Sequence, residues 1–160
     1  MTPVLMDANE HKRSTRIAGY LPIGGKRLLD IGCARGYLLQ FARNRGYDIL
    51  GVEPCNDFTF DDIPHVHSID EVQGQFDVIT CIHTLEHTPD FVYIAERVKE
   101  LLEPGGMLII EVPSRSSGGA FSEVHINFFT PSVLMKLFHP LKQILLKHTP
   151  NTFMTFSKEG

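Results

Sequence analysis

The sequence predicts a single α/β domain over residues 1–160, built on a mostly parallel sheet. Short apolar runs alternate with stretches of helical periodicity, which is the pattern of right-handed βαβ units. Two of these runs, 76–82 and 107–112, contain the β-favouring residues that parallel sheets bury on both faces. Two last β-like runs, 143–148 and 152–157, flank a Pro-Asn pair. They predict a hairpin, so one strand of the sheet should be antiparallel.

The other expected elements follow in chain order. A helix over 12–20 precedes a buried strand, Lys26–Ile31, which ends in Asp30-Ile31 and is followed by Gly32. The next helix, Gly36–Arg45, should stop at Gly46, because glycine favours the left-handed conformation after a helix. Strands are also expected at 47–52 and 65–67. A further helix should have Thr88 as its N-cap, Pro89 at its first position and an apolar stripe from Phe91 to Leu102, and it should stop at Pro104-Gly105-Gly106. Thr130-Pro131 should open a last, short helix.

Composition and charge exclude several classes of function. The chain is 42% apolar and carries a net charge of −4, so it lacks the basic surface that nucleic-acid binders need. The longest apolar run, Met107–Ile110, is too short to span a bilayer, and the polar start has no signal-peptide core. Three cysteines without a CxxC pair are typical of a reduced protein. We therefore expect a cytoplasmic protein with no nucleic-acid partner and no membrane span.

Small and acidic residues gather where the first two strands end. The first strand leads into a turn with small residues at Gly32, Ala34 and Gly36, and Glu53 follows the second strand. In open α/β sheets, ligands bind at the carboxyl ends of the strands, where an acid can take a ribose diol. A glycine-rich turn by itself is a weak signal. A dinucleotide fingerprint would have glycine in place of Tyr37, and Asp30 would repel a pyrophosphate, so this turn suits a cationic ligand.

Four segments occur here in a characteristic order: LLDIGCARGYLLQFA, ILGVEP, FDVITCIHTLEHTPD and LLEPGGMLIIEVP. They resemble the sequential motifs of class I S-adenosylmethionine-dependent methyltransferases, and the third is similar to the ubiquinone-pathway O-methyltransferases. The resemblance runs from Arg27 to Val112, and the segment 125–138 is also similar. It implies a Rossmann-like, doubly wound sheet of seven strands with the last strand antiparallel. It also implies S-adenosylmethionine as cofactor and methyl transfer to an O, N or C nucleophile.

The resemblance assigns roles to individual residues. Asp30 would hold the methionine ammonium group, and Glu53 would accept both ribose hydroxyls. The turn would line the methionine part through its backbone, 68–70 would flank the adenine, and 81–83 would pass under the ligand. The implied cofactor-binding residues are Asp30, Gly32, Cys33, Ala34, Gly36, Glu53, Pro54, Ser68, Ile69, Asp70, Cys81, Ile82, His83 and, near the ligand carboxylate, Arg16.

Two features depart from the family pattern. The family usually has glycine where Ala34 stands, and the extra methyl group narrows the turn. The segment 55–64 is short for a second crossover helix, so we expect a turn there and weaker support for the adenine-side contacts.

Three histidines are candidate catalytic residues: His83, His87 and His125. The ubiquinone-pathway enzymes have Glu-x-x-Glu-His where this chain has His83, Glu86 and His87, and that cluster resembles a divalent-metal site. Because a histidine replaces the first acid, we expect no metal here. A general base is needed only if the acceptor is a weakly acidic hydroxyl. The structural alternatives are that His87 caps a helix or bonds a loop carbonyl, and that His125 anchors its loop.

Two hypotheses about function remain open. The first is a methyltransferase whose site is an open cleft, because the segment 113–129 holds little apolar area and makes a poor lid. Such a cleft suits a large or carried acceptor: a glycan, a lipid-linked intermediate or a protein-bound group. The rival hypothesis is that a second subunit closes the cleft, as in a homodimer. The second hypothesis is a non-catalytic binding module or partner subunit that keeps the fold, which the two departures from the family pattern would explain.

Overall fold

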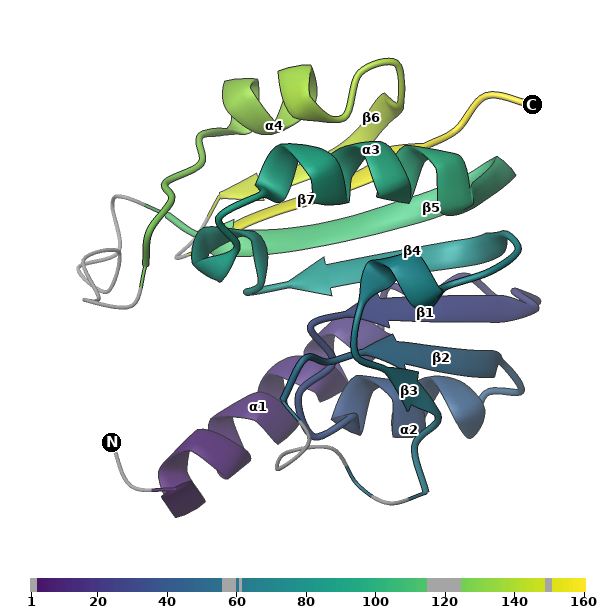
Figure 1. Ribbon diagram of the computed structural model, residues 1–160, viewed down its shortest axis with the longest axis vertical. Helices are drawn as coiled ribbons and strands as arrows, with labels where there is room; N and C mark the ends of the chain where they lie inside the picture. The colour runs from purple at the N-terminus through teal and green to yellow at the C-terminus, as the bar shows by residue number, and fades with distance from the viewer. Residues whose placement is uncertain (1–2, 56–59, 61, 115–124, 149–150) are drawn as a thin grey trace. The chain divides into compact units, whose positions relative to one another are not determined.

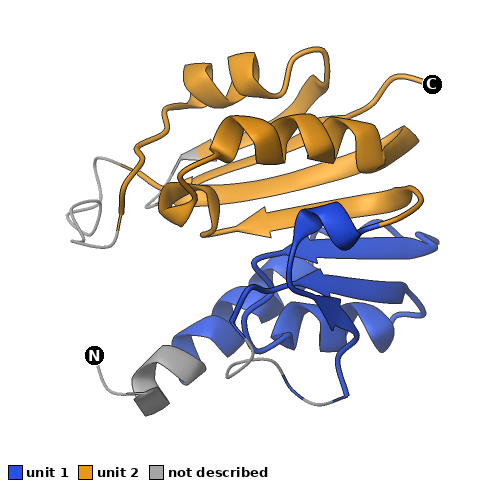
Figure 2. Ribbon diagram, in the orientation of Figure 1, with its two compact units in different colours: residues 1–72 blue, residues 73–160 orange. Residues whose placement is uncertain are grey.

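The computed structural model describes residues 3–55, 60, 62–114, 125–148 and 151–160. Contacts divide the chain into two compact units, 1–72 and 73–160, which Figure 2 colours separately. The single domain expected over residues 1–160 stays a prediction. None of the helices in the described parts of the chain is long and apolar enough to cross a membrane.

Unit 1 combines a three-stranded parallel sheet with two helices (Figure 1). Its strands lie in the order β3-β2-β1, and Asp30 on β1 is paired with Gly51 on β2. Helix α1 contacts α2, and the buried side chains of Leu28, Leu29 and Leu39 contribute to the core. The elements are α1 (Pro3–Ala18), β1 (Arg27–Ile31), α2 (Tyr37–Arg43), β2 (Asp48–Val52), β3 (His65–Val66) and the 3-10 turn η1 (Ile69–Glu71).

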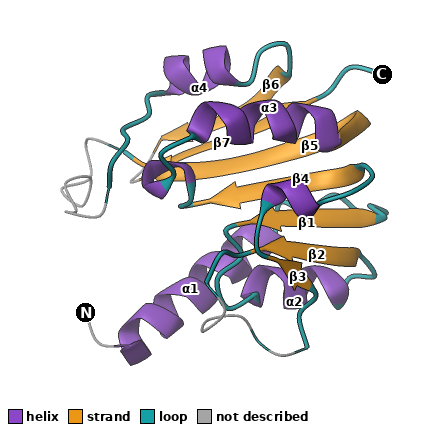
Figure 3. Cartoon of the chain, viewed as in Figure 1, coloured by secondary structure: helices purple, strands orange, loops and turns teal. Residues whose placement is uncertain are grey.

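Unit 2 is a four-stranded mixed sheet with helices beside it (Figure 3). Its strands lie in the order β4-β5-β7-β6, with β4 parallel to β5 and β7 antiparallel to both of its neighbours. Lys99 on α3 donates to the carbonyls of Leu137 and His139, which ties α3 to the end of α4. The elements are β4 (Phe76–Ile82), the 3-10 turn η2 (Leu85–His87), α3 (Phe91–Leu101), β5 (Leu102–Pro113), α4 (Pro131–Leu137), β6 (Lys142–His148) and β7 (Asn151–Ser157).

The predicted fold class is confirmed. The described residues contain seven strands that are mostly parallel and interspersed with helices, and the last strand of the chain is antiparallel. The closing hairpin is confirmed as the β6–β7 pair, although Pro150 of its turn lies outside the described residues. Gly46 has a φ of 88°, the left-handed conformation expected after α2.

The boundaries of α3 and β5 differ from the prediction. Helix α3 begins at Phe91 with Asp90 as N-cap. The hydroxyl of Thr88, expected to cap this helix, donates instead to the Thr84 carbonyl at 2.9 Å, so Thr88 closes η2. Strand β5 begins at Leu102, and the Pro-Gly-Gly segment lies inside it. The register between β4 and β5 shifts at this point, and that irregularity absorbs the extra residues.

Candidate active site

The turn after β1 is shaped by backbone hydrogen bonds to the end of β2. The N–H groups of Gly32 and Cys33 donate to the Val52 carbonyl at 2.8 and 3.2 Å, and that of Gly36 donates to the Cys33 carbonyl at 2.8 Å. Gly32, Ala34 and Gly36 all have positive φ, at 74°, 45° and 88°. Glycine adopts this conformation at little cost, so the alternating small residues allow the tight turn that leads into α2.

Glu53 locks this turn from the end of β2. Its Oε2 accepts the N–H of Ala34 at 3.0 Å, and its Oε1 accepts the N–H of Cys55 at 3.0 Å. Its own N–H donates to the Val66 carbonyl at 2.9 Å. Each carboxylate oxygen has two acceptor directions, so a half-buried Glu53 can still accept two hydroxyl groups from a ligand.

Asp30 places a second acid at the end of β1. The residue is only 4% exposed, although it stands one position before the end of the strand. The position opposite Asp30 in β2 is Gly51, which has no side chain. The turn is therefore flanked by two acidic residues on neighbouring strands, an arrangement that suits a cationic ligand carrying hydroxyl groups.

The other predicted cofactor residues of unit 1 are more scattered. Ser68 caps η1, its Oγ accepting the N–H of Asp70 and its own N–H donating to a carboxylate oxygen of Glu71. Ile69 is buried, whereas Pro54, Asp70 and Arg16 are exposed. Their contacts with a cofactor stay predictions. In the segment 55–64, residues 56–59 and 61 lie outside the described part of the chain, so the turn expected there also stays a prediction.

We predict that Ala34→Gly raises the free energy of unfolding by up to about 1 kcal/mol. The left-handed conformation costs a residue with a Cβ roughly 1–2 kcal/mol, which exceeds the roughly 0.5–1 kcal/mol of backbone entropy that glycine loses. Ala42→Gly is the matched control, because Ala42 lies in α2 and should lose about 1 kcal/mol or more. Urea unfolding measures both variants, and a loss of stability in Ala34→Gly would contradict the prediction.

The end of β4 carries the first of the three candidate histidines. Cys81 is buried and Ile82 is half-buried on this strand. His83 follows with a φ of 54°, and its N–H donates to the Glu111 carbonyl on β5 at 2.8 Å. Whether Cys81, Ile82 and His83 contact a cofactor stays a prediction.

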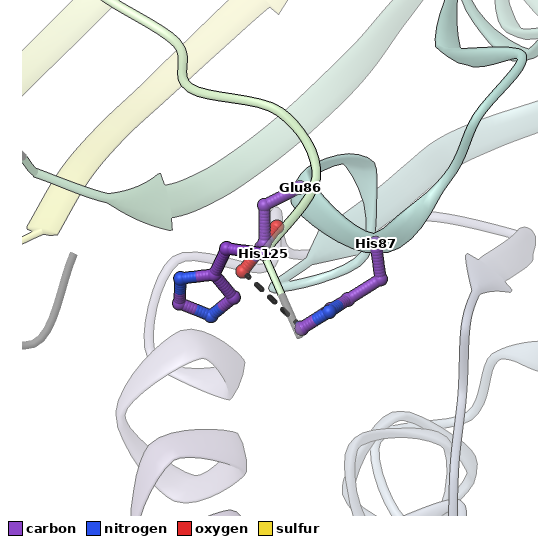
Figure 4. Close-up of side chains that lie close together, drawn as sticks. All are labelled: Glu86, His87 and His125. Atoms are coloured by element: carbon purple, nitrogen blue, oxygen red, sulfur yellow. Dashed lines mark ion pairs between the residues drawn. The ribbon is translucent and has the colours of Figure 1, made fainter. Parts of the chain in front are cut away.

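A buried carboxylate lies between the other two histidines. The side chain of Glu86 is 2% exposed, and its oxygens have no hydrogen-bond partner among the described residues. His87 Nε2 lies 3.9 Å from Glu86 Oε1, and the imidazole centroids of His87 and His125 are 4.9 Å apart. Figure 4 shows the three side chains close together, with the ion pair between Glu86 and His87 as a dashed line. One oxygen or nitrogen from each lies within 4.8 Å of the others, close enough to bind one cation together.

Backbone hydrogen bonds hold the segment that carries His125 against η2. The N–H groups of Ile126 and Asn127 donate to the Glu86 carbonyl at 2.9 and 3.1 Å. The Asn127 amide nitrogen also donates to the carbonyls of Leu85 and Thr88. Asn127 therefore anchors this segment, and an anchoring role for His125 stays a prediction.

Three features of this region were not predicted from the sequence. Glu111 is 1% exposed, and its Oε1 lies 3.0 Å from His83 Nε2. Asn151 on β7 donates to the same Glu111 oxygen at 3.2 Å. The signal for Glu111 was available, because it is the one acid within the apolar run MLIIEVP. Next to the buried Phe129, the side chain of Phe128 is 47% exposed.

Comparison with known proteins identifies the family. A family model described as a methyltransferase domain matches residues 9–141. The ubiquinone biosynthesis O-methyltransferase of Acinetobacter baumannii is 30% identical, over 59% of this chain and 46% of that protein. The chain thus spans less than half the length of this curated relative.

Solved structures share the fold at low sequence identity. A chain from the complex of the Haloferax volcanii Trm112 methyltransferase activator with its methyltransferase partner has a TM-score of 0.80 at 12% identity, covering 95% of this chain and 92% of that one. Magnesium protoporphyrin IX methyltransferase from Synechocystis PCC 6803, solved with bound S-adenosylmethionine, has a TM-score of 0.72 at 12% identity, covering 96% and 82%. The chain therefore belongs to the methyltransferase domain family and has the Rossmann-like, doubly wound fold of class I S-adenosylmethionine-dependent methyltransferases.

Proposed function

We propose that this domain binds S-adenosylmethionine and transfers its methyl group to an O, N or C nucleophile of an acceptor. The observation that carries the proposal is Glu53, whose Oε2 accepts the Ala34 N–H of the glycine-rich turn and whose Oε1 accepts the N–H of Cys55, and which keeps acceptor capacity for a diol. The family match supports the same cofactor.

The residues of unit 1 fit the two ends of this cofactor. The buried Asp30 would attract the ammonium group, Glu53 would accept the ribose hydroxyls, and the backbone of 32–36 would line the part between them. When bound, S-adenosylmethionine supplies an electrophilic methyl group on a sulfonium, which is a good leaving group. The chain's contribution is then mostly to position donor and acceptor, which is where the largest entropic gain in such a reaction lies.

For a hydroxyl acceptor, His87 is the proposed general base. Its side chain is 40% exposed, so an acceptor can reach it, and Glu86 lies at ion-pair distance from its Nε2. A neighbouring carboxylate stabilises the imidazolium that forms when the ring takes a proton. His125 contacts the His87 ring and is proposed to orient it.

We further propose that the acceptor is large or carrier-bound: a glycan, a lipid-linked intermediate or a protein-bound group. The sequence of the segment 113–129 holds little apolar area, which makes it a poor lid. The net charge of −4 disfavours a nucleic acid. The rival to a large acceptor is a homodimer in which the second subunit completes the site. A monomer by solution mass that methylates a small diffusible molecule with a micromolar KM would contradict both ideas.

We predict that Glu53→Ala weakens binding of S-adenosylmethionine by about tenfold or more, since a hydrogen bond to a charged group contributes roughly 1.5–3 kcal/mol. Calorimetry with S-adenosylmethionine and its demethylated product measures the effect. The matched control is Asp48→Asn, which removes an acid from the opposite end of the same strand, where the side chain is 76% exposed. Absence of binding to the unchanged protein at millimolar ligand would end the proposal.

A non-catalytic partner subunit is the second candidate. Ala34, with its methyl group in the turn, favours this reading, and one structural relative was solved with a methyltransferase activator. The same calorimetry separates the two candidates, because a partner subunit without a working pocket would bind neither ligand.

A further inference from the structure

The backbone N–H groups of the glycine-rich turn, residues 32–36, all donate to acceptors within unit 1. Three of them donate to main-chain carbonyls. The other two donate to carboxylates, that of Ala34 to Glu53 Oε2 at 3.0 Å and that of Arg35 to Glu10 Oε1 at 3.2 Å. Glu10 belongs to α1 and lies 25 positions before Arg35. Because these donors are already bonded, the turn presents carbonyl and carboxylate oxygens to a ligand, which favours positive charge.

Ring contacts explain why α1 brings Glu10 to this turn. The imidazole of His11, the next residue of α1, makes edge-to-face contacts with Tyr37 and Phe41 of α2, at centroid distances of 5.1 and 5.4 Å. Since α2 begins directly after the turn, these contacts hold α1 beside the turn as well (Figure 1). Glu10 is half-buried there, so salt screens its charge less than that of a fully exposed carboxylate.

Charge distinguishes the proposed cofactor from the product that it leaves behind. S-adenosylmethionine carries a sulfonium, and transfer of the methyl group converts this sulfonium into a neutral thioether. The ammonium, the carboxylate and the ribose hydroxyls are the same in both molecules. Contacts with these shared groups therefore support both ligands alike, whereas a negative charge near the turn attracts the sulfonium in addition.

We propose that Glu10 is a specificity-determining residue that favours S-adenosylmethionine over its demethylated product. Its carboxylate holds the N–H of Arg35, which supports the turn for either ligand. It also adds a third acid to Asp30 and Glu53 at the same turn, and this charge raises the affinity for the sulfonium form alone. The product is then released more readily after each transfer. The proposal rests on the proposed function, because it requires that this turn binds the cofactor.

Calorimetry of Glu10→Gln with S-adenosylmethionine and with its demethylated product tests the role of the charge. Glutamine keeps an oxygen that can accept the N–H of Arg35 but carries no charge. The ratio of the two affinities should shift toward the demethylated product by about threefold or more. Asp48→Asn is the matched control, because it removes an acid from the exposed start of β2 and should leave the ratio unchanged. An unchanged ratio in Glu10→Gln would overturn the proposal.

Glu10→Ala separates the charge from the hydrogen bond. Alanine removes both, so it should shift the affinity ratio as glutamine does and also weaken the binding of both ligands. An equal loss for the two ligands would make Glu10 a structural support of the turn and would overturn its role in specificity. A failure of the proposed function gives a different result, because the unchanged protein would then bind neither ligand. Binding of both ligands with a ratio that does not depend on Glu10 overturns the specificity proposal alone.

Discussion

Replacing His87 with asparagine is expected to slow methyl transfer to a hydroxyl acceptor by roughly 10²- to 10⁴-fold, the usual contribution of a general base. Asparagine keeps a polar group but cannot take a proton at neutral pH. The affinity for S-adenosylmethionine should change much less than the rate, because His87 is proposed to act on the acceptor, whereas Asp30 and Glu53 are proposed to hold the cofactor. Initial rates of labelled-methyl incorporation into an acceptor fraction measure the effect.

His139→Asn is the matched control, since it makes the same change at an exposed histidine of unit 2. An equal loss of rate in both variants would show that His87 is not the base. The rates should also be insensitive to a chelator, because the sequence predicts no metal. An activity that a chelator abolishes and a divalent cation restores would instead assign a cation to Glu86, His87 and His125.

Asp30→Asn is expected to weaken binding of S-adenosylmethionine by about 10- to 150-fold. The cofactor carries an ammonium and a sulfonium against one carboxylate, and a charged hydrogen bond contributes roughly 1.5–3 kcal/mol, with about 1.4 kcal/mol for each factor of ten. Asparagine has nearly the same shape, so the melting temperature should change much less than the affinity. Calorimetry and thermal unfolding of the same preparation compare the two effects.

The opposite outcome is equally informative. A collapse of the melting temperature with unchanged affinity in the folded fraction would make Asp30 a structural residue. Asp48→Asn again provides the control, because it removes an acid of the same kind from the exposed start of β2.

The turn and its acids could be predicted because their signals are local. The backbone at Gly32 and Gly36 needs positive φ, which glycine adopts readily, and the sequence shows this directly. Glu53 could be predicted because the length of one βα unit fixes where the second strand ends. The start of α3 was predicted wrongly, because a local sequence pattern does not say which helix it caps. Thr88 closes η2 and is not the N-cap of α3.

The surroundings of His83 could not be predicted, because they depend on pairing between distant segments. Glu111 reaches His83 across 28 positions of sequence, and Asn151 reaches Glu111 across 40. Both contacts require the register of β5 against its neighbours, and a slip of one residue would turn Glu111 to the other face of the sheet. No local pattern determines that register.

The lock that Glu53 places on the glycine-rich turn has a kinetic consequence. The N–H of Ala34 is bonded to Glu53, a residue of the chain itself, so folding orders the turn. A ligand then does not pay the entropy of ordering this loop when it binds. Association should accordingly proceed without a slow rearrangement of the turn, and ligands that differ in affinity should differ mainly in how long they stay bound.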